Sequence, residues 1–220
     1  MPRGFSEREK ELIGRRLLEQ GYKQFSAHGL KRTNVEELAA AAGISKGAFY
    51  KFYESKEALF MAVIEEAETR VRQEVLAAVD LPGPSPRARL FAVLKKAFHL
   101  FRTIPILQFF TGSDYELLFR GLPAEGLQQH LAGDRAFIEE LVTRCQDAGI
   151  PIRAEWEQIV GLLYPLVLAT LHQADLGPSG FGGNIDLLLE LVAAFCLGEV
   201  ETQLQQPVSP AADSAEGIPL

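Results

Sequence analysis

Hydrophobic residues recur three or four positions apart along most of the chain, and the alternation typical of β-strands is sustained nowhere. The first predicted helix opens with Ser6 and Glu9, which have the spacing of a capping box, and it stops at Gly29. One face of this helix is apolar and is formed by Ile13, Leu17, Leu18, Tyr22 and Phe25. Because the same period continues through the chain, the sequence predicts an all-α protein.

Two short helices are predicted next. Thr33 and Glu36 repeat the cap spacing and open a helix over 34–42. Gly43 ends this helix, because glycine adopts the left-handed conformation without steric cost. Ser45 then caps the second short helix. Two short helices joined by a tight turn that contains glycine are typical of a helix-turn-helix.

The rest of the chain is predicted to form longer helices. A break at 54–55 precedes a helix that begins near Lys56, and the proline- and glycine-rich stretch 80–86 separates this helix from those that follow. Stretch 177–183 is predicted to be a flexible loop, and 207–220 lacks periodicity and is predicted to be a disordered tail. The other helices are predicted over 86–103, 105–111, 113–120, 123–148, 153–175 and 184–204.

The composition is that of a soluble globular protein, and we expect a cytoplasmic one. Of the 220 residues 47% are hydrophobic and 23% are charged. No run approaches the roughly 18 apolar residues of a membrane helix, and the N-terminus lacks the apolar core of a signal peptide. Cys145 and Cys196 are too few for a disulfide framework or a cysteine-based zinc site, so we expect reduced, buried thiols.

Charge is distributed unevenly along the chain. The net charge is −7, but residues 1–60 hold eleven Lys and Arg against eight Asp and Glu, whereas 61–220 hold eleven against twenty-one. A mildly basic head on an acidic body indicates that only the head meets a polyanion. The short helices lie in this head, where Gly47 leaves the backbone open to close approach by DNA. The side chains suited to phosphates there are Lys46, Tyr50, Lys51 and Lys56.

The segment FSAHGLKRTNVEELAAAAGISKGAFYKFYESKEALF (25–60) resembles the N-terminal domain of the tetracycline-repressor (TetR) family of bacterial transcriptional regulators. The resemblance implies a three-helix helix-turn-helix DNA-binding domain over 1–54. It also implies a larger helical domain for effector binding and dimerisation over 55–206. The implied function is that of a ligand-responsive regulator, usually a repressor, that binds a palindromic double-stranded operator and is released by a small effector.

The resemblance also assigns residues to the DNA interface. It implies that phosphates are contacted by Thr33, Lys46, Tyr50 and Lys56, and that the base edges are approached by Ser45, Gly47, Ala48 and Lys51. Two positions depart from the family pattern. Phe52 stands where His or Tyr is usual, and Tyr53 replaces a buried Phe whose site now has to accommodate a hydroxyl.

The helices over 153–175 and 184–204 are the predicted dimer surface. Apolar residues cover more than one stripe of each, so each must be covered both by its own core and by something else. The resemblance implies a four-helix bundle shared by two subunits of a homodimer. The alternative is a large core within a single chain.

Aromatic residues are numerous in the body, and the resemblance suggests an effector cavity among them for an apolar or aromatic small molecule. The candidate lining consists of Phe98, Phe101, Phe110, Tyr115, Phe137, Trp156 and Tyr164.

The sequence argues against an enzyme and gives no reason to expect a cofactor. The glycines of 177–183 match neither a dinucleotide-binding nor a nucleophile-elbow motif. For the histidines at 28, 99, 130 and 172 we expect no carboxylate or cysteine at the spacing of metal ligands, so no metal site is predicted. An all-helical adaptor that does not bind DNA is the alternative to a regulator, and activation is the alternative to repression.

Overall fold

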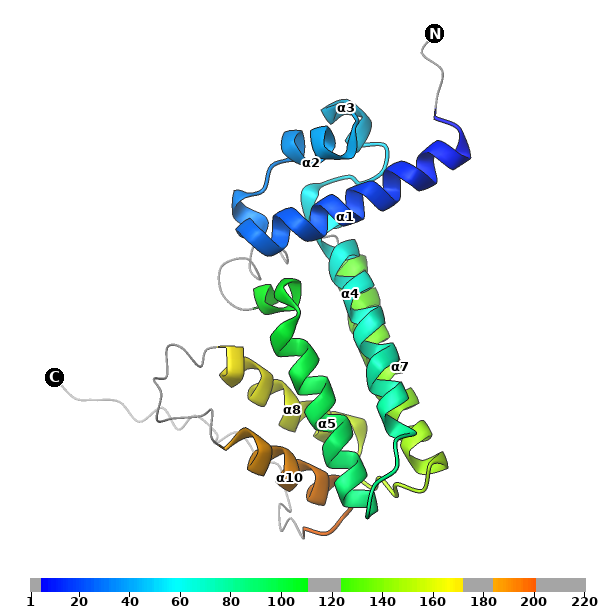
Figure 1. Ribbon diagram of the computed structural model, residues 1–220, viewed down its shortest axis with the longest axis vertical. Coiled ribbons are helices and arrows are strands. Elements are labelled where there is room, and N and C mark those ends of the chain that lie inside the picture. Colours follow the sequence, from blue (N-terminus) through cyan, green and yellow to red (C-terminus); the bar gives the residue numbers. More distant parts are fainter. Residues whose placement is uncertain (1–4, 111–123, 172–183, 201–220) are drawn as a thin grey trace, which may run out of the picture.

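The computed structural model describes residues 5–110, 124–171 and 184–200, and in these ranges all regular secondary structure is helical (Figure 1). This confirms the all-α prediction. The predictions for 113–120, for the loop 177–183 and for the tail 207–220 lie outside the described residues. No helix in the described ranges has the length and apolar character needed to cross a membrane.

The head consists of α1 (Glu7–Arg32), α2 (Val35–Ala42) and α3 (Lys46–Phe49). The predicted capping box is confirmed, because the Ser6 amide donates to Glu9 Oε2 at 2.8 Å while the Ser6 hydroxyl accepts from the Glu9 amide. The apolar sides of the three helices meet in one core. Its fully buried side chains include Leu17, Phe25, Leu30, Leu38 and Phe49.

The predicted cap at Thr33 is wrong by one residue. The side chain of Asn34 accepts from the Glu37 amide at 2.9 Å, so α2 begins at Val35. Thr33 is buried, and its hydroxyl donates to the carbonyl of Gly29 at 2.8 Å. Gly29 itself has a positive φ of 74°, which kinks α1 at the predicted end while the chain continues for one further turn.

Helix α4 (Lys56–Val79) connects the head to the body. Ser55 caps it, as the break in the sequence predicts, by accepting from the Ala58 amide at 3.0 Å. Figure 1 shows α4 passing from beneath α1 down the body, where it packs against α5 (Pro86–Thr103) and α7 (Ala124–Asp147). The boundary between domains at 54–55 stays a prediction, because α4 contacts elements on both sides of it.

The body is completed by the 3₁₀ helix η1 (Pro105–Phe110), α8 (Trp156–Leu171) and α10 (Ile185–Cys196). The predicted helix over 184–204 is too long, because Gly198 takes a left-handed φ of 70° and donates its amide to Phe195 O at 2.9 Å. The carbonyl of Cys196 accepts instead from the Arg153 amide at 2.8 Å, which ties the end of α10 to the segment before α8.

Both cysteines are buried and free. Burial raises the pKa of each thiol to about 11, so neither forms a thiolate readily at neutral pH. Their placement agrees with the expectation of reduced, structural thiols.

Candidate nucleic-acid interface

The turn between α2 and α3 is built from local signals in the sequence. Gly43 ends α2 with a left-handed φ of 79°, and Ser45 starts α3 by accepting from the Ala48 amide at 3.2 Å. Phe49 anchors α3 from below, since its ring is fully buried and packs edge-on against Tyr50 at 5.5 Å between centroids. The other side of α3 faces solvent.

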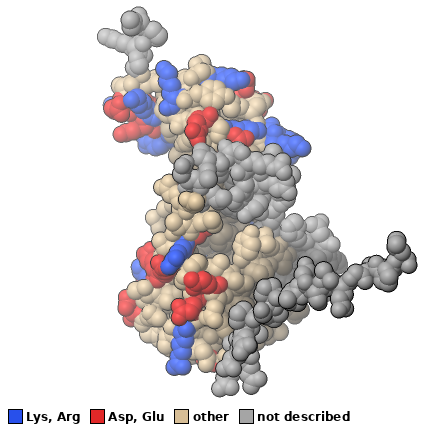
Figure 2. Space-filling view, turned by 180° about the vertical axis from the view of Figure 1, so that it is seen from behind, with Lys and Arg blue, Asp and Glu red and all other residues tan. Residues whose placement is uncertain are grey.

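Five of the eight predicted DNA-binding residues are exposed along this free side and in the turn that follows it, namely Ser45, Lys46, Gly47, Tyr50 and Lys51. Ala48 is half-buried between them. Figure 2 shows one face of the molecule, on which basic and acidic side chains are interspersed over the head. On this face the basic side chains of the head do not form one continuous patch, in keeping with the small excess of basic residues in 1–60.

Lys46 and Lys51, the two lysines on the exposed side of α3 and in the turn that follows it, already have partners within the head. Lys46 forms an exposed ion pair with Glu36 of α2, which raises the pKa of Lys46 and lowers that of Glu36. The ammonium of Lys51 lies 5.9 Å from the centre of the Phe5 ring. That ring also packs against Phe52 at 6.0 Å between centroids, so Phe52 supports the head where the family usually has a polar residue.

The side chains of Thr33 and Lys56 both donate hydrogen bonds to backbone carbonyls at the end of α1. The ammonium of Lys56 donates to the carbonyls of Leu30 at 2.8 Å and Thr33 at 3.0 Å, and therefore caps the end of α1 from the first residue of α4. The Thr33 hydroxyl binds Gly29 within the end of α1, whereas Lys56 joins α4 to that end. Their contact with phosphates stays a prediction, and their observed contacts are structural.

Replacement of Lys56 by methionine is expected to lower the free energy of unfolding by about 1–3 kcal/mol, because two partly buried carbonyls lose a charged donor. Denaturation with urea measures this change. Lys51→Met is the matched control, since Lys51 is exposed and makes no such bond, and it should change stability by less than about 0.5 kcal/mol. Equal stability of the two variants would contradict a capping role for Lys56.

The candidate effector residues are dispersed among different surroundings. Phe98 is buried in the core and Phe101 is half-buried beside it. The rings of Phe137 and Trp156 lie against the guanidinium groups of Arg72 and Arg135, respectively, and Tyr164 is half exposed. The Phe110 side chain and Tyr115 lie outside the described residues. An effector site formed by this set therefore stays a prediction.

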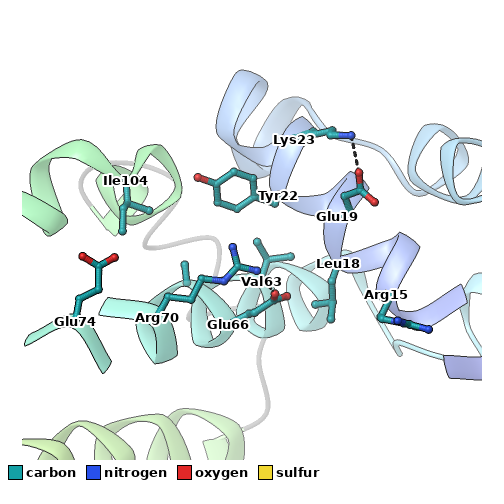
Figure 3. Close-up of a pocket in the computed structure, with 11 residues that line it drawn as sticks. Arg15, Leu18, Glu19, Tyr22, Lys23, Val63, Glu66, Arg70, Glu74 and Ile104 are labelled. Carbon is teal, nitrogen blue, oxygen red and sulfur yellow. Dashed lines mark hydrogen bonds and ion pairs between the residues drawn. The ribbon is translucent and has the colours of Figure 1, made fainter. Parts of the chain in front are cut away.

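A groove of about 520 Å³ lies instead between α1 and α4, with Ile104 at one end (Figure 3). Its walls mix apolar side chains such as Leu18 and Val63 with charged ones that are largely paired, as Lys23 is with Glu19 at 2.8 Å. None of the five aromatic candidates whose side chains the structure describes lines it. The groove lies where α1 of the head meets α4, and its charged lining differs from the aromatic lining that the sequence suggests for the effector cavity.

A polar cluster lies between α4 and α7, partly buried and partly open to solvent. Glu68 is 8% exposed and faces Arg72 of its own helix and His130 and Asp134 of α7. The expectation that no histidine has a carboxylate at ligand spacing is wrong, because Asp134 follows His130 by four residues and so shares its face of α7. That spacing was the available signal in the sequence, whereas nothing local pointed to Glu68.

An exposed α3 that is supported by α1 and α2 defines a helix-turn-helix protein. Residues 17–63 match the family model of bacterial regulatory proteins of the tetR family. The head of the chain is therefore a DNA-binding domain of the tetR family, and the match lies entirely within the head and the first turns of α4.

Curated relatives match over the same part of the chain. The uncharacterised HTH-type transcriptional regulator YuxN of Bacillus subtilis is 35% identical over 80 residues, which are 36% of this chain and 26% of YuxN. The match to YdgC of the same organism is 36% identical over 59 residues and spans 27% of this chain and 30% of YdgC. The chain thus spans only about a third or less of these two relatives' length.

Solved structures match over most of the fold. A TetR-family transcription regulator from Marinobacter aquaeolei has a TM-score of 0.55 at 18% identity, covering 86% of this chain and 97% of its own. The regulator FadR from Bacillus subtilis, solved in complex with stearoyl-CoA, has a TM-score of 0.58 at 15% identity, covering 82% and 97%. At these identities the likeness concerns the fold.

Proposed function

We propose that the protein is a cytoplasmic transcriptional regulator that inserts α3 into the major groove of operator DNA. The observation that carries this proposal is the division of α3 into two sides. Phe49 holds one side fully buried, while the other presents Ser45, Lys46 and Gly47 to solvent, followed by Tyr50 and Lys51 in the next turn. A short helix held in this way suits contact with base edges and neighbouring phosphates.

We further propose that two copies bind a palindromic site through a dimer built on α8 and α10. Large apolar side chains remain exposed on both helices, among them Leu162 at 40%, Leu187 at 56% and Leu191 at 50%. Other residues of the same helices, such as Ile159 and Leu189, are buried in the chain's own core. Each helix therefore has one covered and one open apolar face, as the double coverage inferred from the sequence requires.

The proposed regulation is release from DNA by a small apolar or aromatic effector bound in the body. The FadR structure, of similar fold, was solved with stearoyl-CoA, a ligand that has a long apolar acyl chain. Because α4 contacts α1 in the head and α5 and α7 in the body, a ligand that favours one position of α4 would shift the spacing of the two α3 helices. Repression is the mode we propose.

Selection of bound sequences from random DNA with the purified full chain tests this function. The expected result is an enriched palindrome whose half-sites are separated by about one helical turn or more. Binding of the selected duplex should weaken steeply between 50 and 200 mM salt, on the order of tenfold or more, because contacts to phosphates release counterions. Absence of any enriched sequence would favour the adaptor alternative instead.

Replacement of Lys46 by alanine is expected to weaken operator binding about three- to tenfold and to reduce the slope of log affinity against log salt by about 1. The reason is that one ammonium near the phosphates is lost. Titration of labelled duplex at several salt concentrations measures both quantities. Lys95→Ala on α5 removes a lysine of matched exposure, also paired with a carboxylate, and should leave the slope unchanged. An unchanged slope for Lys46→Ala would remove this residue from the interface.

A further inference from the structure

The cluster between α4 and α7 brings together three side chains that metals prefer. One donor atom each from Glu68, His130 and Asp134 can be chosen so that all lie within 4.8 Å of one another. His130 Nδ1 is 3.7 Å from Glu68 Oε2, and His130 Nε2 is 3.6 Å from Asp134 Oδ2. Glu68 and the His130 side chain are both more than nine-tenths buried. Glu68 and His130 therefore lie inside the body, whereas the Asp134 side chain is 46% exposed and reaches solvent.

We propose that this cluster is a binding site for one divalent first-row transition metal ion, with zinc as the representative. The ligands are one imidazole nitrogen of His130 and one carboxylate oxygen each of Glu68 and Asp134. A borderline ion of this kind accepts both nitrogen and oxygen donors, and water completes four-coordination.

The geometry requires movements of up to about 1.4 Å. Donors about 2.1 Å from a tetrahedral ion lie about 3.4 Å apart, whereas one donor atom from each of the three side chains lies within 4.8 Å of the others. The separations of 3.7 and 3.6 Å start from the two different nitrogens of His130, so the carboxylate beside the nitrogen that does not bind the ion has to move toward the one that does. His130 and Asp134 are one helical turn apart on α7, which fixes their side chains next to each other. Glu68 supplies the third ligand from the neighbouring helix.

In the absence of an ion, Arg72 supplies the positive charge that faces Glu68 and Asp134. Its guanidinium lies 2.6 Å from Asp134 Oδ1 and 3.2 Å from Glu68 Oε2. This one guanidinium therefore faces two carboxyl groups. The Arg72 side chain is 27% exposed, so it can turn toward solvent when an ion enters.

Competition between Arg72 and the ion distinguishes a metal site from a salt-bridge network. In a salt-bridge network, removing the guanidinium would not strengthen the binding of a metal ion by the cluster. In a metal site, removing it leaves three ligands without their competitor, and the ion binds more tightly. Arg72→Gln, which keeps much of the side chain's length, is therefore the informative variant.

The experiment titrates the chelator-treated full chain with zinc chloride in competition with a chromophoric chelator. We expect one equivalent to bind, His130→Ala and Asp134→Asn to weaken binding about tenfold or more, and Arg72→Gln to tighten it several-fold. His99→Ala removes an exposed histidine of α5 and should change nothing. Circular dichroism establishes that each variant is folded. If the His130→Ala variant does not fold, the zinc affinity of the Asp134→Asn variant tests the proposal.

Three outcomes would overturn the proposal. The first is that the unaltered chain binds no zinc in the concentration range in which the chelator competes. The second is that the Asp134→Asn and His130→Ala variants bind as tightly as the unaltered chain. The third is that Arg72→Gln weakens binding. Because no DNA is present in the assay, its result is independent of the proposed regulatory function.

Discussion

Replacing both Leu187 and Leu191 by lysine is expected to convert the protein into a monomer and to weaken operator binding on the order of 100-fold or more. The two side chains lie one turn apart on α10 and are 56% and 50% exposed, so they form one apolar strip. Charges placed on this strip would have to be buried against the partner. A monomer engages one half-site at a time and loses the advantage of two linked contacts.

Sedimentation velocity and titration of labelled operator measure the two effects. Leu131→Lys is the matched control, because Leu131 is also 56% exposed but belongs to α7, which Figure 1 shows apart from α10. It should remain dimeric with unchanged affinity. If the double variant of α10 also remains dimeric, the interface lies elsewhere on the molecule.

Replacing Gly47 by alanine is expected to weaken operator binding roughly 10- to 100-fold without lowering stability. A Cβ at position 47 would meet no atom within 4 Å, and the residue does not have a positive φ, so the fold does not require glycine there. Alanine is favoured over glycine in a helix by up to about 1 kcal/mol. A methyl group inserted into a close contact between backbone and DNA costs about 1–3 kcal/mol, which is the stated loss of affinity.

Gly126→Ala on α7 provides the control. A Cβ there also meets nothing within 4 Å, but the position belongs to the body, so neither affinity nor stability should fall. Thermal unfolding and operator titration of both variants give the comparison. Unchanged affinity of Gly47→Ala would show that the backbone of α3 does not approach the DNA closely at this residue.

The helix starts show why much of the head is predictable. Ser6, Ser45 and Ser55 each accept a hydrogen bond from an amide three residues later, so the signal and its partner lie within one turn. The end of α10 was missed because the signal, Gly198, lies within a stretch whose apolar residues continue the helical period. The cap at Thr33 was misplaced because Asn34, directly after it, is an equally good cap.

Contacts between distant segments were not predictable in the same way. Lys56 reaches back to the end of α1, and its ammonium cannot be assigned to those carbonyls or to a phosphate from spacing alone. The aromatic residues of the body were grouped by composition, yet Phe137 and Trp156 each lie against a different arginine. Composition gives the number of aromatic rings in a region but not which of them face one another.

The sequence by itself determined most of the helix starts, the turn between α2 and α3 and the resemblance of the head to the tetR family, because caps, glycine turns and apolar period act between residues a few positions apart. Only the tertiary structure decided that Lys56 joins α4 to the end of α1, and that Glu68 meets His130 and Asp134 across two helices. The physical reason is that burial and charge compensation depend on distances through space. Those distances are fixed only when the whole core is packed.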